Sequence, residues 1–135
     1  MPITTHRNPT KDLTTFNCNG DLSFTEIVAV IERYFQATIA PPTSKILWDM
    51  RTASIDTLTK DHVYRIANLV NDYKAKAKGT KISVVVSKEI NFEMVKRFKA
   101  ESKETLENII VFRKIDEATE WLKKESEEIS FTASE

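Results

Sequence analysis

Two short segments near the N-terminus combine β-compatible residues with polar positions that alternate along them. They run from Ile3 to Arg7 and from Leu13 to Cys18, and a cluster of turn-forming residues at 8–12 separates them. This pattern predicts a β-hairpin. The alternating polar positions indicate that one face or one edge of the hairpin contacts water.

Two longer stretches then repeat apolar residues at the spacing of an amphipathic helix. The first helix begins at a capping box formed by Ser23 and Glu26, and the second runs from Thr59 to about Lys78, with Gly79 as its C-cap. The expected buried stripes are Phe24, Ile27, Val28, Ile31 and Phe35 in the first helix, and Val63, Ile66, Ala67, Val70, Tyr73 and Ala77 in the second. Each stripe requires something to pack against.

Apolar runs without alternation predict strands within the core, at 46–48, 82–86 and 109–112. A third helix falls between Ser87 and Lys103. The apolar residues of a short last helix are Ile115, Ala118, Trp121 and Leu122. Strands that alternate with helices predict an α/β fold in which right-handed crossovers join parallel strands.

The composition fits one domain of ordinary size. The chain has 135 residues, which we divide into a domain over residues 1–123 and a loosely ordered acidic tail over 124–135. Hydrophobic residues make up 41% and charged residues 30% of the chain, as in soluble globular proteins. The 20 basic and 20 acidic residues give a formal net charge of zero, so we expect no nucleic-acid partner.

The expected compartment is the cytoplasm. The N-terminus lacks the apolar core of a signal peptide, and no run approaches the roughly 20 apolar residues of a membrane span. We therefore expect no transmembrane segment, which still leaves peripheral membrane contact open. The lone Cys18 agrees with a reducing compartment, since it has no cysteine with which to form an internal disulfide.

The stretch from Lys45 to Asp61 carries the most suggestive chemistry. An apolar strand meets Asp49 and Arg51, a hydroxyl-rich loop follows, and Thr59 starts a helix. Ligands gather at the carboxyl ends of strands in wound α/β sheets. An acid placed there is able to accept a phosphoryl group or to hold magnesium, but no acidic pair follows the preceding strand. We favour the alternative in which Asp49 caps loop amides or pairs with Arg51.

Motifs for catalysis are missing from the sequence. Neither His6 nor His62 follows a nucleophile elbow, and two glycines cannot build the usual phosphate-cradling loops. One cysteine and two histidines do not have the spacing of a structural zinc site. We therefore expect no enzymatic activity, no cofactor and no metal.

Three blocks of the chain resemble the SpoIIAA-like family, which is STAS-like and related to the CRAL-TRIO fold. They are ILWDMR (Ile46 to Arg51), FEMVKRFKA (Phe92 to Ala100) and VFRKIDEATEWL (Val111 to Leu122). Their order along the chain is that of the family. The last block departs from the family's pattern, because Lys114 stands where an acidic helix cap is usual. That change costs about 1 kcal/mol of capping energy and leaves the expected fold unaltered.

The resemblance implies a mostly parallel sheet of four strands with an added N-terminal antiparallel edge strand, crossed by about four helices. It also implies binding rather than catalysis. In STAS regulators that oppose anti-sigma factors, phosphate on a hydroxyl at a helix start switches a protein partner. Here Thr57 occupies the acceptor's place, but Leu58 follows it where the family has a small residue, and Thr59 is needed as a helix cap. We therefore expect that the switch is lost and that this surface binds constitutively.

CRAL-TRIO relatives hold apolar molecules in a pocket, so two kinds of ligand remain open: a protein partner and an apolar small molecule. The candidate partner or switch surface is Asp49, Arg51, Ser54, Asp56, Thr57 and Thr59, and the candidate apolar pocket is Phe92, Met94 and Phe98. A small enzyme or a phosphoryl-accepting switch that uses Asp49 and the Ser54–Thr59 loop is the alternative function. Because right-handed crossovers place several helices on one sheet face, we also expect a homodimer that covers the other face.

Overall fold

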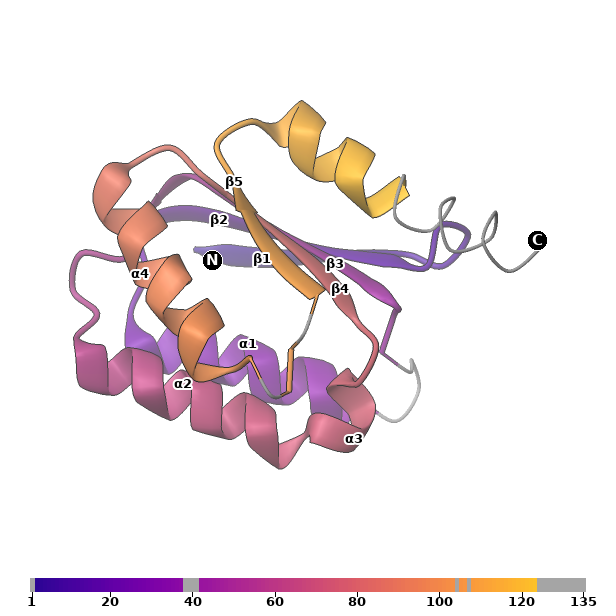
Figure 1. Cartoon of the computed structure of the whole chain (residues 1–135), viewed down its shortest axis with the longest axis horizontal. Coiled ribbons are helices and arrows are strands. Elements are labelled where there is room, and N and C mark those ends of the chain that lie inside the picture. The colour runs from indigo at the N-terminus through magenta and orange to yellow at the C-terminus, as the bar shows by residue number, and fades with distance from the viewer. Residues whose placement is uncertain (1, 38–41, 104, 107, 124–135) are drawn as a thin grey trace.

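The computed structural model of the chain describes residues 2–37, 42–103, 105–106 and 108–123. Its centre is a five-stranded sheet with the strand order β1-β2-β3-β4-β5 (Figure 1). The strands are β1 (Ile3–Asn8), β2 (Leu13–Asp21), β3 (Lys45–Ser54), β4 (Lys81–Val86) and β5 (Asn108–Phe112). β1 is antiparallel to β2, and all later neighbours are parallel. The expected α/β fold, with four parallel strands and an antiparallel edge, is confirmed.

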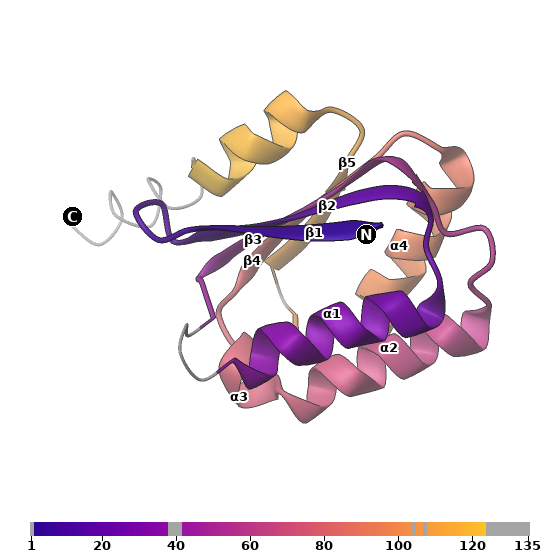
Figure 2. The same cartoon turned by 180° about the vertical axis from the view of Figure 1, so that it is seen from behind.

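Helices cover the two faces of the sheet unequally. The elements α1 (Phe24–Gln36), α2 (Lys60–Asp72), α3 (Lys74–Ala77) and α4 (Glu89–Glu101) lie on one face, and the helical segment 115–123 lies on the other (Figures 1 and 2). This arrangement follows from the strand order. Each parallel strand from β2 to β5 adds beside the one before it, so every right-handed crossover passes over the same face.

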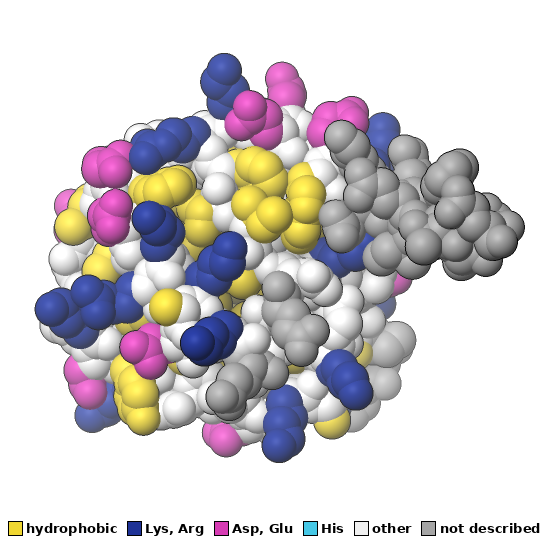
Figure 3. Space-filling model, in the orientation of Figure 1, with side chains coloured by type: hydrophobic (Ala, Val, Ile, Leu, Met, Phe, Trp, Pro, Cys, Tyr) yellow, Lys and Arg dark blue, Asp and Glu magenta, His cyan; other side chains and the backbone are white. Residues whose placement is uncertain are grey.

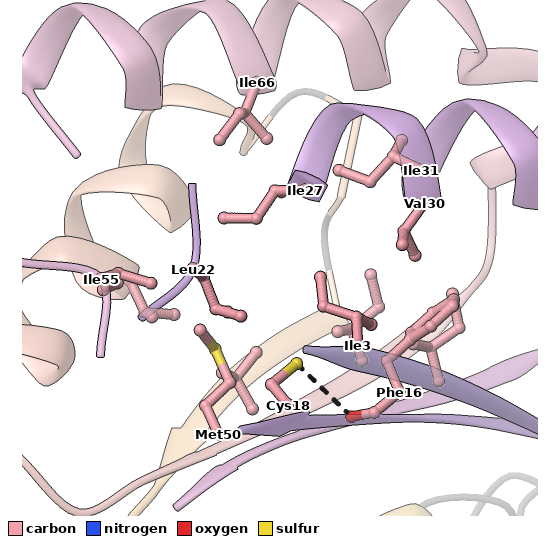
Figure 4. Close-up of a cluster of buried hydrophobic side chains, with 14 of the residues drawn as sticks. Ile3, Phe16, Cys18, Leu22, Ile27, Val30, Ile31, Met50, Ile55 and Ile66 are labelled. Atoms are coloured by element: carbon pink, nitrogen blue, oxygen red, sulfur yellow. Dashed lines mark hydrogen bonds between the residues drawn. The ribbon is translucent and has the colours of Figure 1, made fainter. Parts of the chain in front are cut away.

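The main core lies between the sheet and α1, α2 and α4. Ile3, Phe16 and Cys18 on the first two strands point toward Ile27 and Ile31 of α1 (Figure 4). The predicted capping box fixes the start of this helix, with the Glu26 amide donating to the Ser23 hydroxyl at 3.1 Å and the Ser23 amide donating to Glu26 at 2.9 Å. The capping box therefore satisfies the amides of Ser23 and Glu26 at the start of α1.

A second, smaller core fills the space under the segment 115–123. Leu47 and Val85 on the sheet pack against Ala118 and Leu122, and Ser83 donates a hydrogen bond of 3.1 Å to the Ala118 carbonyl. Every residue of β4 is buried, which agrees with a strand covered on both faces. Hydrophobic side chains also gather on the surface beside this helix (Figure 3).

The second predicted helix ends earlier in the structure than the sequence indicates. The helix expected from Thr59 to Lys78 ends at Asp72, and a separate short turn, α3, follows. Between them, Tyr73 leaves the helical conformation and stacks on Phe35 at 4.9 Å. The helix thus breaks where this tertiary contact forms, and helical periodicity cannot reveal such a contact. The predicted acidic tail at 124–135 lies outside the described residues, as do residues 38–41.

Candidate functional site

Asp49 lies in the middle of a strand and not at its end. β3 continues to Ser54 because β2 pairs with it as far as Asp21, well beyond the point where β4 stops beside Met50. The expectation that the strand ends at Asp49 is therefore wrong. The side chain lies on the outer face of the sheet, the face that carries Leu47, and not in a crevice at the carboxyl edge.

Asp49 and Arg51 form the predicted ion pair. The guanidinium of Arg51 donates from Nε to Oδ1 at 2.9 Å and from Nη2 to Oδ2 at 2.7 Å, and the Arg51 amide donates to the same carboxylate at 3.2 Å. The side-chain hydrogen bonds from Arg51 lower the pKa of Asp49 from its ordinary value, although partial burial opposes them. The pKa of Arg51 is raised in return. All three of these hydrogen bonds to the Asp49 carboxylate come from Arg51. The carboxylate is therefore a structural partner of the guanidinium.

The Ser54–Thr59 loop lies at the carboxyl ends of β2 and β3, apart from the Asp49 carboxylate. Each of its hydroxyls already has a partner. Ser54 is 5% exposed and accepts from the Asp56 amide at 3.3 Å, and Thr57 donates to the Leu22 carbonyl at 3.2 Å. Thr59 is the N-cap of α2, as predicted: it accepts from the His62 amide, and the His62 ring accepts from the Thr59 amide, both at 3.1 Å. Asp56 is exposed.

An apolar pocket lies within the main core. Its volume is about 120 Å³, and side chains from the sheet and from α1, α2 and α4 line it. Met94 and Phe98 of the predicted set are among the lining residues, together with Trp48 of β3. Phe92 is not among the lining residues. The guanidinium carbon of Arg113 instead lies over its ring, 4.1 Å from the ring centroid. The structure thus brings two of the three predicted pocket residues together.

A second pocket lies between β1 and α1, and we call it the arginine pocket. Its volume is about 420 Å³, and Arg7 and Arg33 line it. Sequence analysis did not identify this site. The sequence does contain a signal that Arg7 faces inward. Side chains alternate along a strand, so Arg7 shares one face of β1 with buried Ile3. No comparable signal shows that Arg33, on the exposed side of α1, reaches the same pocket.

Comparison with known proteins identifies the architecture. No family model matches the sequence, and no curated protein matches it. The structure is similar to that of an uncharacterised protein of the DUF3478 family from Shewanella loihica PV-4, which is described as having a SpoIIAA-like fold. The two share 15% sequence identity over 89% of this chain and 91% of the other, with a TM-score of 0.52.

This chain has a SpoIIAA-like fold. At 15% identity the likeness concerns the fold alone. Within the SpoIIAA-like fold, both pockets lie on the sheet face that α1 covers, whereas the Asp49–Arg51 pair lies on the opposite face.

Nowhere among the residues that the structure describes do three His, Cys, Asp or Glu side chains come close enough together to hold a metal ion. Nor does any helix among them combine the length and the apolar character needed to cross a membrane.

Proposed function

We propose that the protein is a non-enzymatic binding module that holds a small apolar molecule in the apolar pocket. The observation that carries this proposal is the pocket itself: a volume of about 120 Å³ with almost wholly hydrocarbon and aromatic walls. An engineered apolar cavity of about 150 Å³ in another protein stays dry and binds benzene. The volume here suits a ligand part of similar size, such as one aromatic ring or a short branched chain.

The side chains around the pocket favour binding over chemistry. Among the residues that the structure describes, none that lines this pocket carries a carboxylate, an amine, an imidazole or a thiol. Tyr34 brings a hydroxyl group to the lining, and this hydroxyl accepts a hydrogen bond of 2.8 Å from the Thr43 amide. Walls of this kind supply dispersion contacts and exclude water, but they offer no general base and no strong nucleophile.

The helix α4 gives the pocket a wall that is able to adapt. Met94 has an unbranched, flexible side chain that fits irregular gaps, and Phe98 lies one helical turn further along the same face. Both are only partly buried, so their outward movement requires little repacking elsewhere. We expect α4 to be the element that shifts when a ligand enters.

The Ser54–Thr59 loop supports a role without a phosphorylation switch. Ser54 is buried, Thr57 is bonded to a backbone carbonyl and Thr59 caps α2. A phosphate on Thr59 would remove the cap of a helix that packs on the core, and one on Ser54 would require the strand end to open. This surface, together with Asp49 and Arg51, stays the candidate surface for a protein partner. The SpoIIAA-like fold fits a STAS-like module.

Benzene binding to the folded protein tests the proposed pocket. Trp48 lines the pocket and Trp121 does not, so Trp121→Phe leaves a single tryptophan whose fluorescence reports on the pocket. We expect benzene to change that fluorescence and to raise the melting temperature, because a ligand that binds only the folded state stabilises it. Native mass spectrometry of the purified protein would show whether an apolar molecule already accompanies it.

Neighbouring positions in β4 supply a matched pair of variants. Val84 lines the apolar pocket, whereas Val85 faces the second core with Leu47 and Ala118. Val84→Phe should fill the pocket and abolish benzene binding, and Val85→Leu should leave it intact. If folded protein with an empty pocket shows no response to saturating benzene, the proposed function is wrong.

A further inference from the structure

The arginine pocket is lined by two positively charged side chains that form no ion pair with the described residues. Among the six arginines, Arg51, Arg65 and Arg113 each form an ion pair with a nearby acid, at 2.7, 2.8 and 2.8 Å. Within the described part of the chain, Arg7 and Arg33 have no such pair. None of the described residues that line their pocket is acidic.

The position of these two arginines is set by the fold. Arg7 comes from the edge strand β1 and is half-buried, and Arg33 comes from the last turn of α1. Figure 2 shows β1 and α1 running on the near side of the molecule, so the space between them lies at its surface. Thr5, which shares the strand face of Ile3 and Arg7, also lines the pocket and is exposed. Two guanidinium groups with a hydroxyl beside them are suited to an anionic group with several oxygen acceptors.

The arginine pocket adjoins the apolar pocket. Phe16 and Tyr34 line both, and the two rings meet edge to face with their centroids 5.7 Å apart. The Thr43 amide holds the Tyr34 hydroxyl at 2.8 Å, which keeps this ring in position between the pockets. A single ligand that passes these rings would have one end among hydrocarbon walls and the other beside two cations.

We propose that the ligand is an anionic amphiphile: a small molecule with a benzene-sized apolar end and a carboxylate or phosphate head. The apolar end occupies the apolar pocket, and the head binds Arg7 and Arg33. This inference rests on the proposed function, because it requires the apolar pocket to bind. It goes further in assigning the class of ligand and in assigning a binding role to two residues on the opposite side of Phe16 and Tyr34.

Three probes with the same apolar end separate the contributions of the two pockets. They are 4-phenylbutyrate, 4-phenylbutyl phosphate and the uncharged 4-phenylbutan-1-ol, and titration calorimetry measures their dissociation constants. One charge-assisted hydrogen bond corresponds to about a tenfold change in affinity. We expect at least one of the two anions to bind at least about tenfold more tightly than the alcohol, and the tighter anion identifies the head group.

The variants Arg7→Gln and Arg33→Gln test the assigned residues. Each should weaken the anion by about tenfold and leave the alcohol and benzene unchanged. Arg97→Gln is the matched control, since Arg97 is an exposed arginine on α4 that lines neither pocket. Retained benzene binding shows that each variant is folded.

The outcomes distinguish the two proposals. If benzene and the alcohol bind but neither anion gains affinity, or if both arginine variants leave the anion's affinity unchanged, the head-group assignment is wrong and the proposed function stands. If neither benzene nor any of the three probes binds, the proposed function fails and the head-group assignment fails with it. Tighter binding of an anion that is lost in Arg7→Gln and Arg33→Gln but kept in Arg97→Gln establishes the site.

Discussion

The side chain of Asn91 accepts a hydrogen bond of 3.2 Å from the backbone amide of Ile55. Its amide nitrogen also donates to the Ala53 carbonyl at 2.9 Å. Asn91 belongs to the first turn of α4 and is fully buried. One side chain therefore joins α4 to the end of β3, at the point where the Ser54–Thr59 loop leaves the sheet.

Asn91→Ala should destabilise the protein by about 3 kcal/mol, because it leaves a buried carbonyl and a buried amide without partners. Urea denaturation measures this loss. Hydrogen exchange at the Ile55 amide should become faster in the same variant. Asn68→Ala, at an exposed position of α2, is the control and should change the stability by no more than about 0.5 kcal/mol.

Asp49→Asn should lower stability at neutral pH by no more than about 1 kcal/mol, since Arg51 is 43% exposed and solvent screens the pair. The pKa of Asp49 is lowered on folding, so the unfolded chain takes up the proton first as the pH falls. The stabilisation is therefore present above the ordinary pKa of 3.8 and is lost as the pH drops through the lowered value. Denaturation at pH 7 and at pH 2 measures the difference, and an equal loss at both would contradict this assignment.

The thiol of Cys18 should resist thiol–disulfide exchange with added reagents in the folded protein. Burial, with a smaller contribution from the charge of Asp49, raises its pKa to about 12, and the thiolate is the reactive form. Ellman's reagent at pH 8 should react only as the protein unfolds. Since the folded pKa is raised, stability should fall between about pH 9 and pH 12, and Cys18→Ala should remove that decline. Fast reaction under native conditions would show that the site opens readily.

Leu122→Ala should cost about 3 kcal/mol, because the side chain is 3% exposed and fills the second core against Leu47 and Val85. Ile90→Ala is the control on α4, where the side chain is 52% exposed, and should cost little. Thermal denaturation of both variants makes the comparison. Equal small effects would mean that the segment 115–123 contributes little to holding the sheet.

The homodimer stays a prediction. Its first argument was an uncovered apolar face, and the segment 115–123 covers Leu47 and Val85 on that face. Phe112, Ile115 and Trp121 around this segment are only partly buried, and they are the surface on which a second copy would pack. Light scattering at high protein concentration should give the mass of a dimer; a monomer mass would remove the prediction.

Hydrophobic periodicity was sufficient to predict the helices and strands of this fold, but not that the last helix covers the second face of the sheet. The stripe of α1 and its capping box, the wholly apolar β4 and the last helix all occur where the pattern places them. In each of these elements, the positions of the apolar residues indicate which face of the helix or strand is buried. The parallel pairing of the strands follows, because strands that alternate with helices are joined by right-handed crossovers.

The pattern failed where the surroundings of a residue decide its role. Asp49 and Arg51 resemble the start of a loop, yet they continue β3, because the outer face of that strand is open to water at this point and tolerates charge. Likewise, Asn91 carries no sequence signal that distinguishes it from a solvent-exposed asparagine. Its two backbone partners become visible only when α4 is placed against β3.

Among the pocket residues, too, spacing along the chain indicated some positions, and only tertiary packing reveals the others. Met94 and Phe98 share a helix face with buried Val95, so their spacing indicated an inward position. Phe92 has a similar spacing, but the guanidinium of Arg113 covers its ring. Arg7 and Arg33 come from separate elements, and only the packing of α1 beside β1 brings them to one pocket.

The strand order has a consequence for how the chain is made. From β2 onward, each strand pairs with the strand synthesised just before it, so no earlier pair has to separate to admit a later strand. Synthesis from the N-terminus is therefore able to extend the sheet at one growing edge, with each helix closing over the strand that it follows. The segment 115–123 comes last and docks on the opposite face after β5 has joined. A nascent chain released before this segment emerges would expose Leu47 and Val85, which leaves this stage of synthesis open to aggregation and to chaperone binding.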